Sequence, residues 1–226
     1  MLCIGHRGAM GHEPENTLLS IKKALSLGVD AVEIDVYNVE DNLVVIHDRD
    51  LSRTTNGTGN VEQQSFAYLR SLDAGKGEQI PTLPEVLEII NRRVIINIEL
   101  KGQNTARLVV ALIQEYLERG WRETDFVVSS FNHYELNLVK TACPQIKIGM
   151  LMYGLPWNCL TMARQLQADI IIFGLDFVTP EWVRLVHQQN LPIWVYTVNQ
   201  LEEIDRLRTL GVDAVFTNYP ERVVSN

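Results

Sequence analysis

The chain has 226 residues, of which 46% are hydrophobic and 21% are charged, an ordinary composition for a globular protein with a sizeable core. Its formal net charge of −8 argues against a broad nucleic-acid surface, because such surfaces are basic. No apolar stretch approaches the roughly 18 residues of a membrane span, and the N-terminus lacks the basic and apolar regions of a signal peptide, so we expect a cytoplasmic protein without stable membrane insertion.

Three cysteines, Cys3, Cys143 and Cys159, lie far apart in the sequence. Their number is odd, and most of them fall within apolar stretches. Both observations favour buried free thiols in a reducing compartment over a disulfide framework.

Short apolar segments of strand length recur along the chain. Most are continuous rather than alternating, as in the segments 94–98 and 170–173. Continuous runs are typical of strands covered on both faces, as in a parallel sheet. The predicted strands are 2–5, 31–36, 43–46, 94–98, 126–130, 147–151, 170–173, 192–196 and 213–216.

Amphipathic stretches between these strands predict helices. The predicted helices are 16–27, 83–91, 104–119, 133–142, 158–167, 180–189 and 200–210. Asn16, Thr82 and Thr179 are their expected N-terminal caps, the last two followed by a proline and a glutamate. Glycines expected just past helix ends, where a left-handed residue is favoured, are Gly28, Gly120 and Gly211.

Strands and helices that alternate in this way predict an α/β fold of repeated βαβ units. Eight of the strands form a closed (β/α)8 TIM barrel in this prediction, and 43–46 is an extra strand directly after 31–36. We expect residues 1–226 to be one domain, with the polar segment 49–80 an insertion at one mouth of the barrel. A doubly wound open sheet is the alternative, but no G-x-G-x-x-G turn follows any predicted strand.

Chemistry-bearing side chains gather where predicted strands end. His6 and Arg7 follow the first strand, Glu33 and Asp35 end the second, His47 follows the extra strand, and Glu99 and Lys101 end the next. In a β/α barrel the carboxyl ends of the strands form the working face. These residues therefore predict an active site at one end of the barrel.

The three carboxylates indicate a metal site. Alternation along a strand places Glu33 and Asp35 on the same side, and Glu99 can approach from the neighbouring strand. An all-oxygen ligand set suits a hard divalent ion, Mg²⁺ or Ca²⁺, rather than zinc. In the alternative interpretation the acids are structural ion-pair partners of Arg7 and Lys101.

Two of the five histidines stand at the predicted working face. Histidine titrates near neutrality, so His6 and His47 can serve as general base and general acid. Asp48 follows His47, but adjacent side chains on a strand point apart, so the pair is not expected to form a relay. The other three histidines, His12, His133 and His187, are interpreted as structural.

Other candidate motifs are weaker. Ser129 and Ser130 end a strand without a nucleophile elbow, and Ser130 is interpreted as pocket lining. The segment 56–59 lacks the signature of a phosphate-binding loop and is interpreted as a turn. Aromatic residues near strand ends, available either for a pocket or for the core, are Phe131, Trp194, Tyr196 and Tyr219.

The order of these motifs resembles the glycerophosphodiester phosphodiesterase family over nearly the whole chain. The segments that carry the resemblance are His6-Arg7-Gly8, Pro14-Glu15-Asn16-Thr17, Glu33-Ile34-Asp35-Val36, Val44-Val45-Ile46-His47-Asp48, Ile80-Pro81-Thr82-Leu83, Ile98-Glu99-Leu100-Lys101, Thr197-Val198-Asn199 and Thr217-Asn218-Tyr219-Pro220.

The resemblance implies a β/α barrel with a small insertion, and hydrolysis of glycerophosphodiesters to glycerol 3-phosphate and an alcohol. It implies that His6 and His47 are the acid–base pair and favours His6 as base. It further implies that Glu33, Asp35 and Glu99 bind a divalent metal ion, and that Arg7 and Lys101 contact the phosphate of a small-molecule substrate.

Two segments depart from the family pattern. Asp41-Asn42-Leu43 stands where the family often has Asp-Gly, a difference confined to a turn. Tyr196 stands where tryptophan is common, so this residue is expected to affect the shape of the substrate pocket and the preference for the alcohol.

Three other functions remain open from the sequence. They are a lysophospholipase D activity at the same site, a metal-free lyase or aldolase that uses Lys101 in a Schiff base, and a silent barrel that binds a phosphorylated metabolite. The sequence leaves the head group, the choice between Mg²⁺ and Ca²⁺ and the oligomeric state undetermined.

Overall fold

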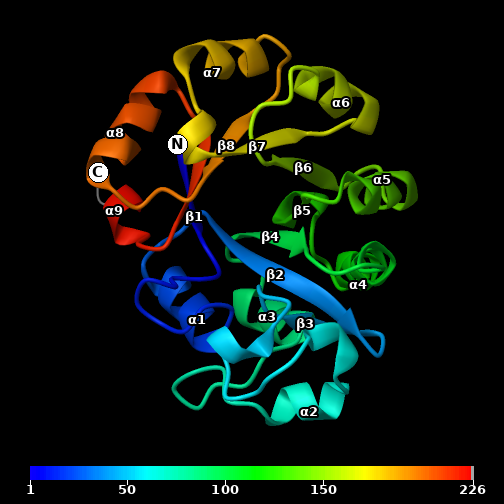
Figure 1. Ribbon diagram of the computed structural model, residues 1–226. Coiled ribbons are helices and arrows are strands. Elements are labelled where there is room, and N and C mark those ends of the chain that lie inside the picture. The colour runs from blue at the N-terminus through cyan, green and yellow to red at the C-terminus, as the bar shows by residue number, and fades with distance from the viewer. Residues whose placement is uncertain (225–226) are drawn as a thin grey trace.

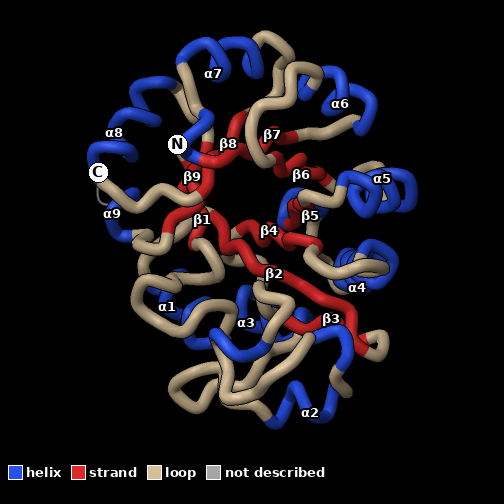
Figure 2. The backbone as a smooth tube through the Cα atoms, viewed as in Figure 1, coloured by secondary structure: helices blue, strands red, loops and turns tan. Residues whose placement is uncertain are grey.

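The computed structural model describes residues 1–224, which contain a closed barrel of eight parallel strands ringed by helices (Figure 1; Figure 2). The barrel strands are β1 (Leu2–Gly5), β2 (Ala31–Val39), β4 (Ile95–Leu100), β5 (Phe126–Ser130), β6 (Lys147–Met152), β7 (Ile170–Gly174), β8 (Ile193–Tyr196) and β9 (Ala214–Thr217). Pairing of β1 with both β2 and β9 closes the ring. The predicted TIM barrel is confirmed, and the open sheet is excluded.

The barrel strands are buried on both faces, which explains their continuous apolar sequences. Inside the ring a small core includes Ile4, Ile172 and Phe216, and a larger core fills the layer between strands and helices. Apolar side chains on both faces of each strand are therefore removed from water, and this burial stabilises the fold.

The surrounding helices confirm the predicted ones to within about two residues at their ends. They are α1 (Leu18–Ser26), α3 (Leu83–Ile90), α4 (Ala106–Glu118), α5 (His133–Ala142), α6 (Cys159–Leu166), α7 (Pro180–His187) and α8 (Leu201–Leu210). Two short helices were not predicted, α2 (Phe66–Ser71) and α9 (Glu221–Val224).

Thr82 and Thr179 cap α3 and α7 as predicted, and Thr82 forms a reciprocal capping box with Glu85. Asn16 was predicted to cap α1, which is wrong, because Thr17 accepts the hydrogen bond from Ser20 N–H. The side chain of Asn16 instead contacts Asp35, as described below. The glycines predicted beyond helix ends all have positive φ: Gly28, Gly120 and Gly211.

The extra strand β3 (Asn42–Val45) pairs antiparallel with the outer part of β2. Glu40 and Asp41 connect the two strands, both with positive φ, so the turn forms without a glycine. The segment 49–80 follows. It contains α2 and the 3₁₀ helices η1 (Leu51–Arg53) and η2 (Val61–Gln63), and it packs a separate small core against β2 and β3 (Figure 1).

The three cysteines are buried and form no disulfide within residues 1–224, in agreement with the predicted free thiols. In the same part of the chain, no helix is both long and apolar enough to cross a membrane.

A buried carboxylate on α5 caps the neighbouring helix α4. Glu135 accepts hydrogen bonds from the backbone N–H groups of Asn104 and Ala106, at 2.9 and 2.8 Å, where Thr105 makes no side-chain cap. We expect Glu135→Ala to lower the free energy of unfolding by about 1–3 kcal/mol, because two backbone N–H groups at the start of α4, that of Ala106 buried, lose their acceptor. Urea denaturation measures this, with exposed Glu118→Ala as the control. Equal effects of the two substitutions would contradict the capping role.

Candidate functional site

The three predicted acidic residues meet at the carboxyl ends of β2 and β4. Glu33 and Asp35 project from the same side of β2, and Asp35 lies opposite Glu99 in the register of the two strands. One ligand oxygen from each lies within 4.8 Å of the others. The predicted convergence of these side chains is therefore confirmed.

Burial disfavours the charged form of these carboxylates. Glu33 and Asp35 are only 2% and 1% exposed. Burial, then the neighbouring Asp35, raises the pKa of Glu99 to about 7, and the same two causes raise the pKa of Glu33. Within residues 1–224, Glu33 Oε1 and Asp35 Oδ1 accept no hydrogen bond. Buried oxygens without donors fit a divalent cation with oxygen ligands, which relieves both the repulsion and the desolvation.

The predicted cations lie against these acids. Lys101 Nζ is 3.0 Å from Glu99 Oε1 and 3.8 Å from Asp35 Oδ1, and Arg7 Nε is 3.4 Å from Asp35 Oδ2. The contacts of the structural ion-pair interpretation are thus present. Two cations nevertheless face three carboxylates, and among the described residues Glu33 Oε1 and Asp35 Oδ1 still accept no hydrogen bond.

The His-Arg-Gly segment turns sharply so that its backbone also serves the site. Arg7 has a φ of 51° and donates its backbone N–H to Glu33 Oε2 at 2.8 Å. Gly8 follows with a φ of 83°, and a Cβ there would lie 2.4 Å from Ser20 Oγ. Only glycine fits this close approach to α1.

His6 is held by Asn218, which follows β9. His6 Nδ1 lies 2.7 Å from Asn218 Oδ1. An amide oxygen can only accept, so Nδ1 carries the hydrogen and Nε2 is free to accept a proton. Burial and then Arg7 lower the pKa of His6 to about 4, so the imidazole is neutral at neutral pH.

His47 departs from the sequence expectation. Its Nδ1 lies 2.6 Å from Asp48 Oδ1, although the two side chains were predicted to point apart. That prediction was wrong because β3 ends at Val45, and alternation does not extend into the bend that holds His47. On its other side, Lys101 Nζ is 3.2 Å from His47 Nε2.

Sequence reasoning missed several residues that position the site. Asn16, with a φ of 57°, donates its amide to Asp35 Oδ2 at 2.8 Å and accepts from Asp35 N–H. Glu15 pairs with both Arg7 and Arg53. The motifs that carry the family resemblance include Glu15, Asn16 and Asn218. Their place in these motifs indicated that the residues matter, but did not indicate what each one contacts.

Aromatic side chains occupy the opposite part of the mouth. Tyr196 lies at the end of β8 and donates its hydroxyl to the Met152 carbonyl at 3.1 Å. Its ring meets Phe131 edge to face, and Phe131 stacks on Tyr153 at 4.4 Å between ring centroids. Phe131 also lies 5.9 Å from Lys101 Nζ, so the aromatic rings adjoin the charged cluster.

Ser130 does not line this mouth, contrary to prediction. The hydroxyl is fully buried, donates to the Leu100 carbonyl at 2.7 Å and accepts from Asn132 N–H. The three histidines interpreted as structural have partners outside the carboxylate site: His12 contacts Glu221, His133 contacts the Leu151 carbonyl, and His187 contacts Asp213.

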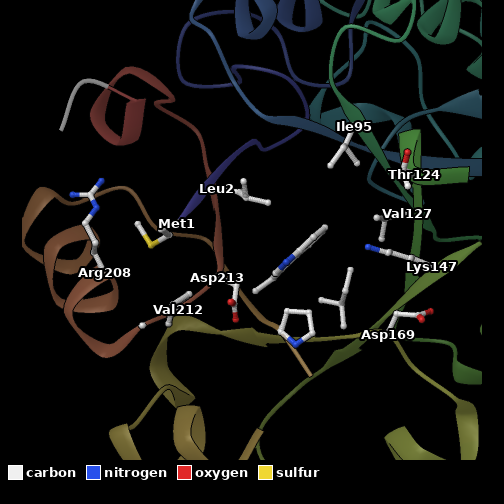
Figure 3. Close-up of a pocket in the computed structure, with 14 residues that line it drawn as sticks. Met1, Leu2, Ile95, Thr124, Val127, Lys147, Asp169, Arg208, Val212 and Asp213 are labelled. Atoms are coloured by element: carbon white, nitrogen blue, oxygen red, sulfur yellow. The ribbon is translucent and has the colours of Figure 1, made fainter. Parts of the chain in front are cut away.

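Trp194 lines a different pocket, at the amino ends of the strands. This pocket of about 600 Å³ also includes Ile95 and Val127. Figure 3 shows Lys147 and Asp169 on one side of the pocket and Met1 and Arg208 on the other. It lies at the opposite end of the barrel from the carboxylates, because its residues precede or begin strands.

Comparison with known proteins gives a consistent family. The family model described as "Glycerophosphoryl diester phosphodiesterase family" matches residues 6–222. A glycerophosphodiester phosphodiesterase of Caldanaerobacter subterraneus is 37% identical over 99% of this chain and 96% of its own length. A relative of the same name from Bacillus subtilis is 30% identical over 98% of this chain and 84% of its own length.

Solved structures agree with the sequence relatives. An Oleispira antarctica phosphodiesterase, in complex with the product sn-glycerol-3-phosphate, superposes with a TM-score of 0.92 at 31% identity, covering 100% of this chain and 96% of the other. A glycerophosphodiester phosphodiesterase of Thermotoga maritima has a TM-score of 0.82 at 27% identity, covering 100% and 97%.

The low pKa of His6 can be measured directly. In protein freed of metal, we expect the His6 imidazole to remain neutral at pH 6 and to titrate near pH 4, because burial and Arg7 both disfavour its cation. Histidine NMR resonances followed against pH, assigned with a His6→Gln variant, provide the measurement. A titration midpoint between pH 6 and 7 would contradict this description of the site.

Proposed function

The chain belongs to the glycerophosphoryl diester phosphodiesterase family and is a phosphoric diester hydrolase, and we propose that it uses a divalent metal ion and two histidines to convert glycerophosphodiesters to glycerol 3-phosphate and an alcohol. The observation that supports this mechanism best is the buried carboxylate cluster, flanked by Arg7 and Lys101 and by two histidines. We also propose that residues 1–226 act as one domain, with 49–80 at the active-site mouth.

Glu33, Asp35 and Glu99 would hold the ion through carboxylate oxygens. Oxygen ligands suit Mg²⁺ and Ca²⁺ alike. When bound, such an ion neutralises negative charge on the phosphate oxygens. Arg7 and Lys101 would contact the same phosphate, since both side chains are already held against the acidic cluster.

The surroundings of the two histidines favour different roles. His6 is neutral and has a free Nε2, which suits a general base. His47 has the Asp48 carboxylate against Nδ1, which orients the ring and leaves Nε2 to exchange the proton, and we assign it the role of general acid. This assignment agrees with the order that the family resemblance favours.

The reaction can then proceed in two balanced steps. His6 takes the proton of a glycerol hydroxyl as that oxygen bonds to phosphorus. The bond from phosphorus to the alcohol oxygen breaks, and His47 protonates this oxygen. Water then opens the cyclic phosphate with the histidines in reversed roles, which yields glycerol 3-phosphate and restores both proton states.

Tyr196 would bind the substrate through its ring rather than its hydroxyl, because the hydroxyl is engaged by the Met152 carbonyl. Release of glycerol 3-phosphate would assign the enzyme to glycerol and lipid metabolism, and we propose a cytoplasmic site of action. The ion pairs of Lys101 disfavour a Schiff base, which needs the free amine.

A lysophospholipase D activity is a second candidate. Tyr153, which stacks on Phe131, is 79% exposed, and Trp157 in the same loop after β6 is 94% exposed. Exposed aromatic rings next to a site favour a substrate with an apolar group. Turnover of lysophosphatidylcholine in a diester panel tests this candidate.

The metal proposal predicts stabilisation by divalent cations. At a concentration about 100 times the Kd, Mg²⁺ or Ca²⁺ should stabilise the EDTA-treated protein by roughly 2.7 kcal/mol, or about 5–10 °C in Tm. Glu33→Gln should abolish this shift, because it removes a charged ligand. Glu88→Gln, on the outer surface, is the matched control. An undiminished shift in Glu33→Gln would contradict the ligand assignment.

The histidine proposal predicts loss of turnover without loss of fold. His6→Ala and His47→Ala should each lower kcat by roughly 10²–10⁴ on glycerophosphocholine or glycerophosphoethanolamine, scored by release of glycerol 3-phosphate. His187→Ala, which removes a surface pair with Asp213, should leave kcat unchanged. Near-wild-type turnover in either site variant would contradict the roles assigned to the two histidines. Wild-type activity that survives EDTA would contradict the metal dependence.

A further inference from the structure

We propose that Asp48 is a positioning residue that fixes the tautomer and orientation of His47, and that Arg53 and Glu15 hold Asp48 in place. The proposal rests on the function above, in which His47 transfers a proton. It also assigns a role to the segment 49–80, because Arg53 lies in η1 of that segment.

The contacts of His47 determine where its hydrogen lies. Lys101 Nζ is 3.2 Å from Nε2, and an ammonium group has donors but no acceptor. Nε2 therefore accepts, and in the neutral ring the hydrogen is on Nδ1. On that side Asp48 Oδ1 lies 2.6 Å away, and a carboxylate can only accept. Two independent contacts thus select the same tautomer.

Asp48 is itself held by a guanidinium group. Arg53 Nε donates to Asp48 Oδ2, while Arg53 Nη1 and Nη2 donate to the two oxygens of Glu15, at 2.8 and 2.7 Å. A planar guanidinium fork imposes direction as well as charge. The side chain of Glu15 is 10% exposed but that of Arg53 is 49% exposed, so solvent partly screens the charges, and the directed hydrogen bonds of the fork matter more than the charge alone.

The same anchor reaches the other half of the site. Glu15 Oε1 also accepts from Arg7 Nη1 at 2.6 Å. One network therefore joins the loop after β1, which carries His6 and Arg7, to the segment that carries His47. The Tyr37 hydroxyl, 3.3 Å from the His47 carbonyl, restrains the backbone of the same bend. Nε2 is then the nitrogen that exchanges the proton during reaction, when Lys101 contacts the phosphate rather than His47.

Asp48→Asn tests the proposal sharply because Arg53 restricts how the amide can lie. The Arg53 Nε donor requires the asparagine oxygen on its side, so the NH₂ group is turned toward His47 Nδ1. A donor at Nδ1 favours the tautomer with its hydrogen on Nε2, in opposition to the Lys101 contact that favours hydrogen on Nδ1. We expect kcat to fall by about 10²-fold or more with KM changed less than threefold. Long-range ¹H–¹⁵N spectra of the imidazole should show the change of tautomer.

Asp50→Asn is the matched control. Asp50 is exposed, lies two residues further on, and accepts from Ser52 N–H, a contact that asparagine can replace. We expect its kcat to stay within twofold of the wild type and the His47 tautomer to be unchanged. An equal loss in Asp50→Asn would overturn the proposal.

A double variant separates positioning from a structural role. In a His47→Ala background, Asp48→Asn should change kcat less than twofold, because the group it positions is absent. A persistent loss of the full factor, or an unchanged His47 tautomer in Asp48→Asn, would overturn the proposal. The spectra do not depend on turnover, so a wild-type protein inactive on every diester would defeat the proposed function while leaving the tautomer result to be judged separately.

Discussion

Three carboxylates within 4.8 Å of one another, two of them almost fully buried, repel each other strongly at the mouth of the barrel. The surrounding residues partly offset this repulsion. Arg7 contributes a side-chain cation and a backbone N–H, Lys101 contributes an ammonium group, and Asn16 contributes an amide. Within residues 1–224, Glu33 Oε1 and Asp35 Oδ1 still accept no hydrogen bond, which is the reason a divalent cation fits this site.

The same charges divide the mouth into two parts. The side formed by β1, β2 and β4 carries the acids, the cations and the two histidines, whereas the ends of β5, β6 and β8 carry aromatic rings. Lys101, 5.9 Å from the ring of Phe131, stands at the boundary. A diester with a charged phosphate and a less polar alcohol matches this division.

The histidines differ because their neighbours differ. Burial and a nearby guanidinium lower the pKa of His6 and keep it neutral, while His47 faces a carboxylate held by a second arginine. Two identical side chains are in this way given surroundings suited to opposite directions of proton transfer. The segment 49–80 contributes to the surroundings of His47 because it supplies Arg53, which holds Asp48. Its own core packs against β2 and β3, outside the barrel ring.

The sequence alone determined the barrel and the convergence of Glu33, Asp35 and Glu99. Alternation along a strand and the common direction of parallel strands are local rules, so they can be read from residue order. Tertiary structure decided the partners of Asp48, Asn16, Ser130 and Asn218. These residues lie in bends or at strand ends, where periodicity no longer sets the direction of a side chain. Most of their contacts join segments far apart in the chain, which only the closed barrel brings together.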